Sequence, residues 1–253
     1  MFTHAITRPP AGTFTDGITT AGLGPPDLAL ALRQHAAYVQ ALRDRGLEVS
    51  VLEAAPAFPD ACFVEDCALL TRRGAVITRP GAASRRGEAA LIAPEIEDRF
   101  ERCARIEAPG TLDAGDVMMV GDHFYIGLSA RTNRAGAQQL LAILDGFGLG
   151  GETVPMRAML HLKTGVAALE HGRLLVTGEF VDAPAFRAFE CIEVPAEEAH
   201  GANALWINDV VLLPAGCPRT RETIRGLGHE VIELDVSEFR KLDGGLSCLS
   251  LRY

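Results

Sequence analysis

The pattern of hydrophobic and polar positions along the chain repeats five times. Each repeat has an apolar run, a short polar turn and a second apolar run, which is the pattern of a β-hairpin. Turns such as Arg73-Gly74 and Asn208-Asp209 suit such a connection. Four repeats cover residues 64–80, 115–132, 162–180 and 203–220, and the fifth is split between the termini, SCLSLRY at the end and MFTHAITRP at the start.

Helical periodicity lies between these hairpins. It is clearest in 27–46 and 134–148, where apolar residues recur at steps of three and four and a glycine, Gly46 or Gly148, ends the pattern. Short strand-like runs follow, at 47–54, 104–110, 152–156, 189–195 and 229–235. The repeating unit is therefore predicted to be a hairpin, a helix and a further strand.

A repeat split between the termini predicts that the N-terminal strand pairs with the C-terminal one and closes a ring. We therefore expect a five-bladed α/β propeller, and a single domain over residues 1–253, because no linker rich in Pro, Gly or Ser divides the chain. In such a ring, the segments at one end of every unit converge on the axis. Four chemically versatile residues lie at or just before a hairpin start and are expected to meet there: Asp66, Asp113, His161 and Cys248.

Composition narrows the class of protein. Hydrophobic residues make up 48% of the chain and charged residues 23%, with no apolar run long enough to cross a bilayer and no export signal at the N-terminus. We expect a cytoplasmic protein that binds no membrane. The six cysteines are expected to be free thiols, and their spacing matches no structural zinc site. A net charge of −9 argues against nucleic acid and is compatible with a cationic small molecule.

Carboxylates cluster in FPDACFVEDC (58–67), which contains Asp60, Glu65 and Asp66. Such a cluster could be a solvated loop, but Glu65 and Asp66 stand among apolar neighbours. Carboxylates buried together need a cation or a proton. A guanidinium group would meet that need, since its planar N–H groups can donate to several carboxylate oxygens.

Further candidates begin or follow the other hairpins. Asp113 and Asp116 flank a turn that an Asx motif alone would explain, His161 could be a hydrogen-bonded core histidine, and Cys248 could be a small buried hydrophobe. Arginines follow two adjacent hairpins, Arg85 in the first case and Arg131 in the second. A pair in equivalent positions could hold one carboxylate by bidentate bonds. Together, the charges outline a ligand with a cation at one end and a carboxylate at the other, such as an arginine derivative.

The motifs FPDACFVEDC, TRPGAASRRGE, EAPGTLDAGD, LSARTNRAG, LHLKTG and KLDGGLSC resemble those of dimethylarginine dimethylaminohydrolases, in the same order and over essentially the whole chain. This resemblance implies the pentein propeller fold of guanidine-modifying enzymes. It implies hydrolysis of Nω-methylated arginines, asymmetric dimethylarginine and monomethylarginine, to citrulline and dimethylamine or methylamine. No cofactor and no metal are implied. The oligomeric state stays open, a homodimer included.

The resemblance also implies a role for each site residue. Cys248 would be the nucleophile, His161 the general acid and base, and Asp113 the residue that orients the histidine. Attack by Cys248 would release the amine and leave a covalent thiouronium adduct, which water then hydrolyses. Substrate binding would fall to seven residues: Asp66 and Glu65 for the guanidinium, Arg85 and Arg131 for the α-carboxylate, and Asp60 with the backbone carbonyls of Ile18 and Leu242 for the α-amino group. Ile18 belongs to residues 13–24, which look like the mobile lid of this family.

Two alternatives remain open at this point. Arginine and agmatine deiminases share the cysteine, the histidine and the carboxylates, although both are usually longer, and agmatine has no carboxylate for Arg85 and Arg131 to bind. A non-catalytic propeller similar to the ribosome anti-association factors would not need Cys248 opposite His161. The charge of Cys248 is a further hypothesis: neighbouring carboxylates should keep the thiol neutral until a cationic substrate binds.

Overall fold

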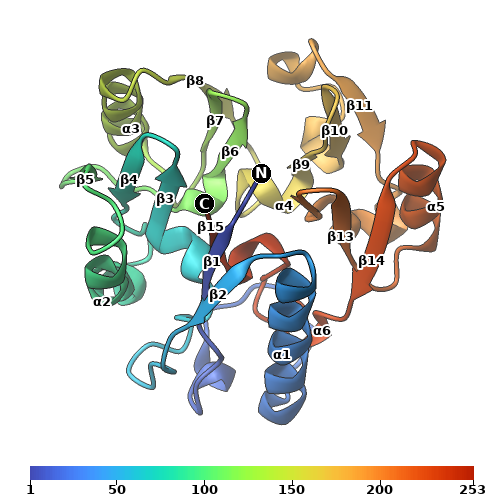
Figure 1. The fold of residues 1–253 in the computed structure, drawn as a ribbon, viewed down its shortest axis with the longest axis horizontal. Coiled ribbons are helices and arrows are strands. Elements are labelled where there is room, and N and C mark those ends of the chain that lie inside the picture. The colour runs from blue at the N-terminus through green and yellow to red at the C-terminus, as the bar shows by residue number, and fades with distance from the viewer.

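Five three-stranded sheets surround a central axis in the computed structural model, which describes all 253 residues (Figure 1). In every sheet, two strands are antiparallel and a third pairs in parallel with one of them. A tight turn can join antiparallel strands, whereas a parallel strand needs a longer crossover. The predicted five-bladed α/β propeller is confirmed.

The strands fall into the five sheets as the hydrophobic repeats predict. The sheets consist of β15 (Leu251–Arg252), β1 (His4–Thr7) and β2 (Glu48–Val51); β3 (Ala68–Thr71), β4 (Gly74–Ile77) and β5 (Cys103–Arg105); β6 (Val117–Val120), β7 (His123–Leu128) and β8 (Gly150–Pro155); β9 (Val166–Ala168), β10 (Arg173–Val176) and β11 (Glu190–Glu193); and β12 (Leu205–Ile207), β13 (Val210–Pro214) and β14 (Glu230–Leu234).

The termini close the ring. β1 pairs antiparallel with β15, with Ile6 opposite Leu251, and parallel with β2, with Ile6 opposite Ser50. The first strand of the chain therefore lies in the middle of a sheet whose outer strands come from opposite ends of the sequence. This confirms the predicted pairing of the two termini.

Four longer helices lie on the outside of the ring, and two short ones lie nearer the axis (Figure 1). Asp27 and Asn133 cap α1 and α3 by accepting hydrogen bonds from the backbone N–H groups of Leu30 and Gly136. The outer helices are α1 (Leu28–Asp44), α2 (Arg86–Glu97), α3 (Arg134–Gly146) and α5 (Pro218–Gly226), and the short ones are α4 (Leu162–Gly165) and α6 (Ser237–Arg240). None of these helices combines the length and the apolar character needed to cross a membrane.

One unit departs from the predicted plan of hairpin, helix and strand. Between β10 and β11 the chain forms only two 3-10 turns, Gly178–Phe180 and Pro184–Phe186, and no α-helix. Gly178 has a φ of +57°, a left-handed conformation that does not continue a helix, and Pro184 has no N–H to donate. The prediction of a helix in every unit is therefore wrong for this sheet.

The hydrophobic core consists of five clusters, each of which joins two neighbouring sheets. Leu69 of β3 packs in one cluster with Phe124 of β7, and Ile6 of β1 packs in another with Ala75 of β4. The remaining three clusters join β6–β7 to β9–β10, β9–β10 to β12–β13, and β12–β13 to β1. Apolar contact therefore runs around the whole ring without a break.

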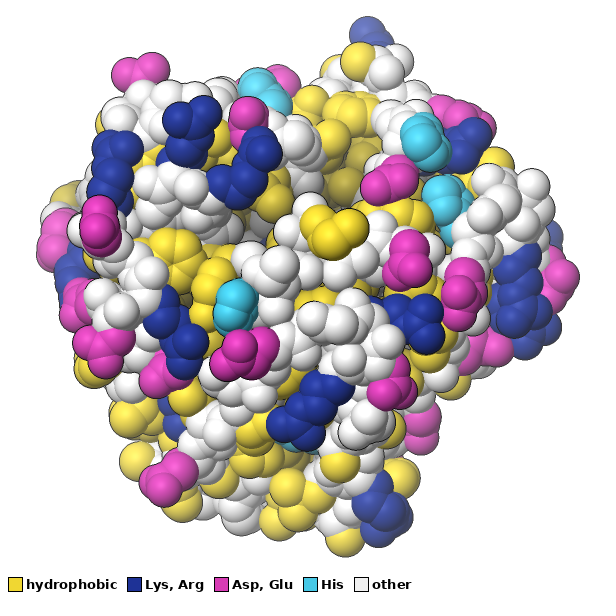
Figure 2. All heavy atoms as spheres, in the orientation of Figure 1, with side chains coloured by type: hydrophobic (Ala, Val, Ile, Leu, Met, Phe, Trp, Pro, Cys, Tyr) yellow, Lys and Arg dark blue, Asp and Glu magenta, His cyan; other side chains and the backbone are white.

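A wide cavity opens along the axis on the face where the termini lie. Its volume is about 740 Å³, and its walls include Leu69, Val117, Val166, Leu205 and Leu251 from the strand that begins each of the five sheets. Figure 2 shows this face, with hydrophobic side chains lining a hollow near its centre. We call this hollow the rear cavity. The functional residues predicted from the sequence lie at its inner end and beyond it.

Candidate active site

The four residues expected on the axis come from short segments that directly precede the first strand of a sheet. Asp66 lies in a 3-10 turn before β3, Asp113 precedes the turn before β6, and His161 caps α4 before β9. Cys248 lies in the 3-10 turn Ser247–Leu249 before β15, where the sequence had suggested that the strand begins. Because these segments occupy equivalent places in the ring, residues far apart in sequence come together.

Asp66, His161 and Cys248 line one small cavity, which is distinct from the rear cavity and which we call the site cavity. Its volume is about 30 Å³, room for roughly one water molecule. The other residues that line it are Ile18, Asp60, Phe63, Arg85, Arg131, Leu160, Leu242, Asp243 and Gly244. This volume is smaller than an amino acid the size of arginine.

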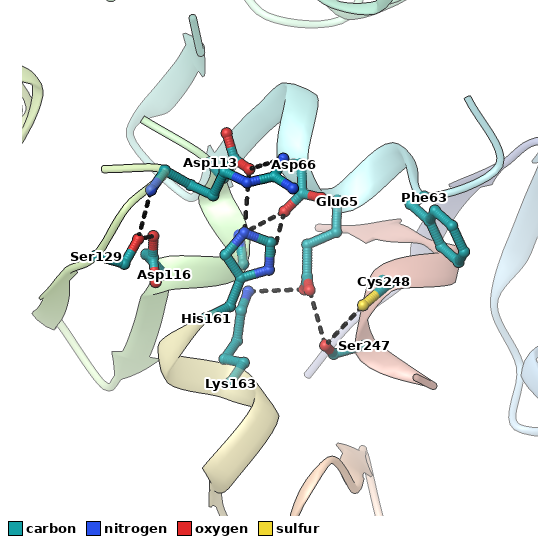
Figure 3. Close-up of polar contacts among 12 residues, drawn as sticks. Phe63, Glu65, Asp66, Asp113, Asp116, Ser129, His161, Lys163, Ser247 and Cys248 are labelled. Carbon is teal, nitrogen blue, oxygen red and sulfur yellow. Dashed lines mark hydrogen bonds and ion pairs between the residues drawn. The ribbon is translucent and has the colours of Figure 1, made fainter. Parts of the chain in front are cut away.

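His161 is buried between two carboxylates. Its Nε2 lies 3.0 Å from Oδ2 of Asp113, and its Nδ1 lies 3.9 Å from Oδ1 of Asp66 (Figure 3). Burial alone would lower the pKa of His161, but the charges of Asp66, Asp113 and Asp116 outweigh it and raise the pKa to about 9. The imidazole is therefore protonated at neutral pH and can give up a proton.

Gly115 makes this arrangement possible. Its backbone N–H donates to Oδ1 of Asp66 at 3.0 Å, and a Cβ at this position would lie 2.7 Å from both that oxygen and Nδ1 of His161. Any side chain would therefore push the carboxylate and the imidazole apart. The glycine between Asp113 and Asp116 is required by this close approach.

The surroundings of Cys248 favour a neutral thiol. The nearest hydrogen-bond donor to Sγ is the backbone N–H of Gly245, at 3.5 Å. Burial, followed by the negative charges of Glu65 and Asp66, raises the pKa of Cys248 to about 12. This agrees with the hypothesis that the thiol stays protonated until a cation reaches it.

Gly244 and Gly245, which precede Cys248, lie close to protein side chains. A Cβ on Gly244 would lie 2.2 Å from the ring of Phe63, and one on Gly245 would lie 2.4 Å from Oδ1 of Asn203. The two glycines thus make room for protein side chains that pack against the loop of the nucleophile.

Arg85 lines the site cavity and is buried in an ion-pair network. Its Nη1 donates to Asp66 at 2.5 Å, its Nε and Nη2 donate to Glu88, and its second Nη2 hydrogen reaches the carbonyl of Phe63 at 3.0 Å. Only one Nη1 hydrogen is left for a ligand. The charges of His161 and Arg85 outweigh burial and hold the pKa of Asp66 at about 2.

Arg131 and Asp60 have free binding capacity at the cavity. The guanidinium of Arg131 makes no hydrogen bond within the chain, and its nearest carboxylate oxygen, on Asp113, is 3.8 Å from Nη1. Asp60 is buried, and its carboxylate accepts hydrogen bonds only from the backbone N–H of Ile18, at 3.1 and 3.3 Å. Burial raises the pKa of Asp60, so a cationic group nearby would stabilise its charged form.

Glu65 does not line the site cavity, which departs from its predicted contact with the guanidinium. It points to the rear cavity and accepts hydrogen bonds from Nζ of Lys163 at 2.7 Å, Oγ of Ser247 at 2.8 Å and Nη2 of Arg252 at 3.1 Å (Figure 3). Sequence neighbours thus face different cavities, since Asp66 and Cys248 line the site while Glu65 and Ser247 line the rear cavity. Glu65 forms part of the partition between the two.

Comparison with known proteins agrees with this geometry. A family model described as N,N dimethylarginine dimethylhydrolase, eukaryotic, matches residues 27–165. The N(G),N(G)-dimethylarginine dimethylaminohydrolase of Pseudomonas aeruginosa is 54% identical, with both chains covered over their full length. The chain belongs to the dimethylarginine dimethylaminohydrolase family.

Two solved structures of this family superpose on the chain over its full length, at 54% sequence identity. A cysteine-to-serine variant of the Pseudomonas aeruginosa enzyme complexed with citrulline gives a TM-score of 0.99. A dimethylarginine dimethylaminohydrolase with histidine replaced by glycine, as an adduct with S-methyl-L-thiocitrulline, gives 0.98. The N-terminal domain of a cyanobacterial arginine dihydrolase, 20% identical with a TM-score of 0.88, shares the fold.

On the sequence alone, Asp116 is a candidate without a role, and Phe63 and Leu160 are not selected. Asp116 is fully buried and accepts hydrogen bonds from Ser129 and from the backbone N–H of Leu162, and burial raises its pKa to about 6. Its position before a hairpin start was a usable signal. Phe63 and Leu160 line the cavity without any polar signature, so the sequence gave no reason to select them.

The side chains that could together ligate a metal ion are Asp66, Asp113 and His161, whose ligand atoms lie within 4.8 Å of one another. These atoms already bond within the chain: Asp66 to Arg85, and His161 to Asp113. A cation there would compete with these bonds and with the one from the backbone N–H of Gly115 to Oδ1 of Asp66. The donor set therefore fits a protonated histidine better than a resident metal.

Proposed function

We propose that the protein hydrolyses Nω-methylated L-arginines to L-citrulline and dimethylamine or methylamine, with Cys248 as nucleophile and His161 as general acid and base. The observation that carries this proposal is that Cys248 and His161 line one cavity, with the imidazole of His161 between the carboxylates of Asp113 and Asp66. The family relatives that hold citrulline or an S-methylthiocitrulline adduct support the same chemistry.

The first half of the reaction breaks a carbon–nitrogen bond. Cys248 releases its proton to solvent once the cationic substrate sits beside it, and its sulfur bonds to the guanidinium carbon. The bond to the methylated nitrogen then breaks, and His161 protonates the departing amine. Asp113 accepts from Nε2 of His161 and holds the ring in place, while Asp66 keeps its charge and favours the imidazolium.

The second half consumes water. The neutral histidine that remains accepts a proton from a water molecule, whose oxygen bonds to the carbon of the thiouronium adduct. The carbon–sulfur bond then breaks, the proton left on that oxygen passes to the sulfur of Cys248, and citrulline is released with His161 protonated again. Every bond change is made by groups of this chain, the substrate and water.

The substrate's α-carbon groups would be held at the cavity mouth. Arg131 has an unused guanidinium for the carboxylate, and Arg85 adds the one hydrogen that its ion pairs leave. Asp60 and the backbone carbonyls of Ile18 and Leu242 would hold the α-amino group. The guanidinium would lie against Asp66, while Glu65 acts from the partition behind it.

Residues 13–24 are proposed as the lid. In the structure, Oγ1 of Thr19 donates to the carbonyl of Lys241 at 2.7 Å, and the backbone N–H of Thr20 donates to Asp243 at 2.6 Å. These bonds bridge the segment to the loop that leads to Cys248, and the enclosed volume is too small for substrate. The lid must open by breaking them before a ligand binds.

The test is release of citrulline from asymmetric dimethylarginine. Wild-type protein should form citrulline and dimethylamine in equal amounts, and Cys248→Ser should lose at least about 10³-fold in kcat, because a serine hydroxyl is too weak a nucleophile without a stronger base. Cys191→Ser is the matched control, since Cys191 is exposed and remote from the site, and should keep full activity. Faster turnover of arginine with ammonia as product would instead indicate a deiminase.

A further inference from the structure

The segments before β3, β6, β9 and β15 each bring a candidate site residue to the axis. The segment before β12, the first strand of the fifth sheet, also brings a polar residue there. Its last polar residue before the strand is Asn203, which is buried. Asn203 precedes β12 by two residues, as Asp66 precedes β3, and His161 lies in the corresponding segment before β9. The repeat therefore puts its side chain next to the residues that carry the chemistry.

Asn203 bonds to both catalytic segments at once. Its Nδ2 donates to the backbone carbonyl of Lys163 at 2.8 Å and to Oγ of Ser247 at 3.0 Å, and its Oδ1 accepts from the backbone N–H of Ser247 at 3.0 Å. Lys163 follows His161 by two residues, and Ser247 precedes Cys248 directly. The amide thus links the segment of the general acid to the segment of the nucleophile.

The orientation of the amide group is fixed by its partners. The carbonyl of Lys163 can only accept and the N–H of Ser247 can only donate, so Nδ2 must face the first and Oδ1 the second. Both Nδ2 hydrogens have partners, and no other arrangement satisfies the two backbone groups. A buried side chain with every hydrogen bond made holds its neighbours in one geometry.

Asn203 belongs to a closed ring of hydrogen bonds. Because Oγ of Ser247 accepts from Asn203, its own hydrogen is free to be donated to Oε2 of Glu65, at 2.8 Å. The other oxygen of Glu65 accepts from Nζ of Lys163, at 2.7 Å. The backbone carbonyl of Lys163 accepts from Asn203, which closes the ring. This ring of four residues comes from the segments before β3, β9, β12 and β15.

We propose that Asn203 is a positioning residue for the hydrolysis: it fixes Cys248, through Ser247, relative to His161, through Lys163. This inference rests on the proposed function. Asn203 lies outside the lining of the site cavity and touches none of the groups proposed to hold the α-carbon of the substrate. Its loss should therefore affect the chemical steps far more than substrate binding, since misplacing reacting groups by about 1 Å can cost about 100-fold in rate.

The test is the kinetics of Asn203→Ala with asymmetric dimethylarginine. We expect kcat to fall about 10- to 100-fold while KM stays within about 3-fold of wild type. Asn203→Asp, which keeps the size and the acceptor but loses both N–H donors, carries the same expectation and serves if the alanine variant does not fold. A kcat within 2-fold of wild type for a folded variant would overturn the proposal, as would a loss confined to KM.

Asn208→Ala is the matched control. Asn208 lies in the same sheet and bonds the backbone N–H and carbonyl of Phe2, so its removal also orphans two backbone groups. Its φ of +56° adds strain to an alanine there, so this control should lower the melting temperature at least as much. Unchanged kcat in Asn208→Ala would separate positioning from stability, whereas an equal loss of kcat would show that only stability matters.

A double-mutant cycle tests the route. If Asn203 acts through Ser247, the combined Asn203→Ala and Ser247→Ala protein should lose less than the product of the two single losses. Losses that simply multiply would contradict that route. Wild-type citrulline release is measured in the same series. A wild type without turnover would count against the proposed function. An active wild type with an equally active Asn203→Ala protein would count against this inference alone.

Discussion

At the scale of the residue, the site depends on which charges are buried together. Asp66 and Glu88 lie on either side of the buried guanidinium of Arg85, and Asp66 and Asp113 lie on either side of His161. Each carboxylate is tolerable in the interior because a cation faces it. Cys248 has no such partner. Burial of its thiol and the nearby carboxylates of Glu65 and Asp66 raise the thiol pKa until a cationic ligand binds.

The ionisation of Cys248 follows from this imbalance. Because its pKa is raised to about 12, the free protein should show no thiolate absorbance in the ultraviolet at neutral pH, and the difference spectrum against Cys248→Ser should grow only as the pH rises above about 10. A bound cationic, non-reactive arginine analogue should move this titration to lower pH. A thiolate titration with a midpoint below about 8.5 in the free protein would contradict the assignment.

The two arginines of the site should respond differently to removal. Arg131→Ala should leave the fold intact and raise KM about 10- to 100-fold, because a hydrogen bond to a charged group contributes about 1.5–3 kcal/mol. Arg85→Ala should lower the free energy of unfolding by about 3–5 kcal/mol, because it leaves Asp66 and Glu88 buried without a cation. Kinetics and urea unfolding distinguish the two, and Arg134→Ala, on an exposed arginine nearby, is the control. A stable Arg85→Ala protein with only a raised KM would show that the main role of Arg85 is to bind the substrate carboxylate together with Arg131.

At the scale of the element, the function depends on short segments rather than on the long helices. The turns before β3, β6, β9 and β15 carry the residues proposed to react, and residues 13–24, the proposed lid, contact the loop before Cys248. These segments are held by side-chain contacts to one another, so their geometry follows from the ring and not from local propensity. The proposed lid is an example, because the distance between it and the residues of the site cavity depends on one glycine, Gly17.

Gly17 allows the lid to close. A Cβ there would lie 2.7 Å from Cδ1 of Leu242 and 2.9 Å from Oδ1 of Asp60, although the backbone, at φ −61°, suits any residue. Gly17→Ala should therefore act through steric contact alone and raise KM about 10-fold, equivalent to about 1.4 kcal/mol, with a smaller change in kcat. Gly12→Ala, in open space in the preceding residues, should change neither constant. Equal kinetics for the two variants would rule out this closing contact.

At the scale of the whole molecule, each sheet shares a hydrophobic cluster with both neighbours, and the termini close the ring. We propose that the 253 residues form a single domain for this reason. A local loss of packing then weakens two sheets at once. The axis also separates the site cavity from the rear cavity by a partition of polar side chains.

Cooperative unfolding is the corresponding prediction. Leu251→Ala in β15 and Leu175→Ala in β10 remove buried side chains on different sides of the ring, and each should cost about 2–5 kcal/mol. Circular dichroism and fluorescence should each show one transition, at the same lowered temperature, for either variant. Leu23→Ala, at a side chain that is 53% exposed, should leave the transition unchanged. Two separate transitions would show that the ring opens into independent parts.

The sequence by itself determined the repeat, the ring and the family. Alternating apolar runs and turn residues are local properties, so the hairpins at 64–80 and 115–132 could be placed without any long-range information. The split repeat then required the termini to pair. The helix expected before β11 does not form, because Gly178 and Pro184 interrupt the short connection between β10 and β11.

Only the tertiary structure decided how the charges pair. Glu65 and Asp66 are adjacent in sequence, yet Glu65 faces the rear cavity and Asp66 the site cavity. Most of the N–H groups of Arg85 donate within the chain, chiefly to Asp66 and Glu88. The glycines before Cys248 make room for Phe63 and Asn203, contacts of roughly 40 to 180 residues in sequence separation. Hydrogen bonds depend on distances of a few tenths of an ångström between such segments, and a pattern along the chain does not contain those distances.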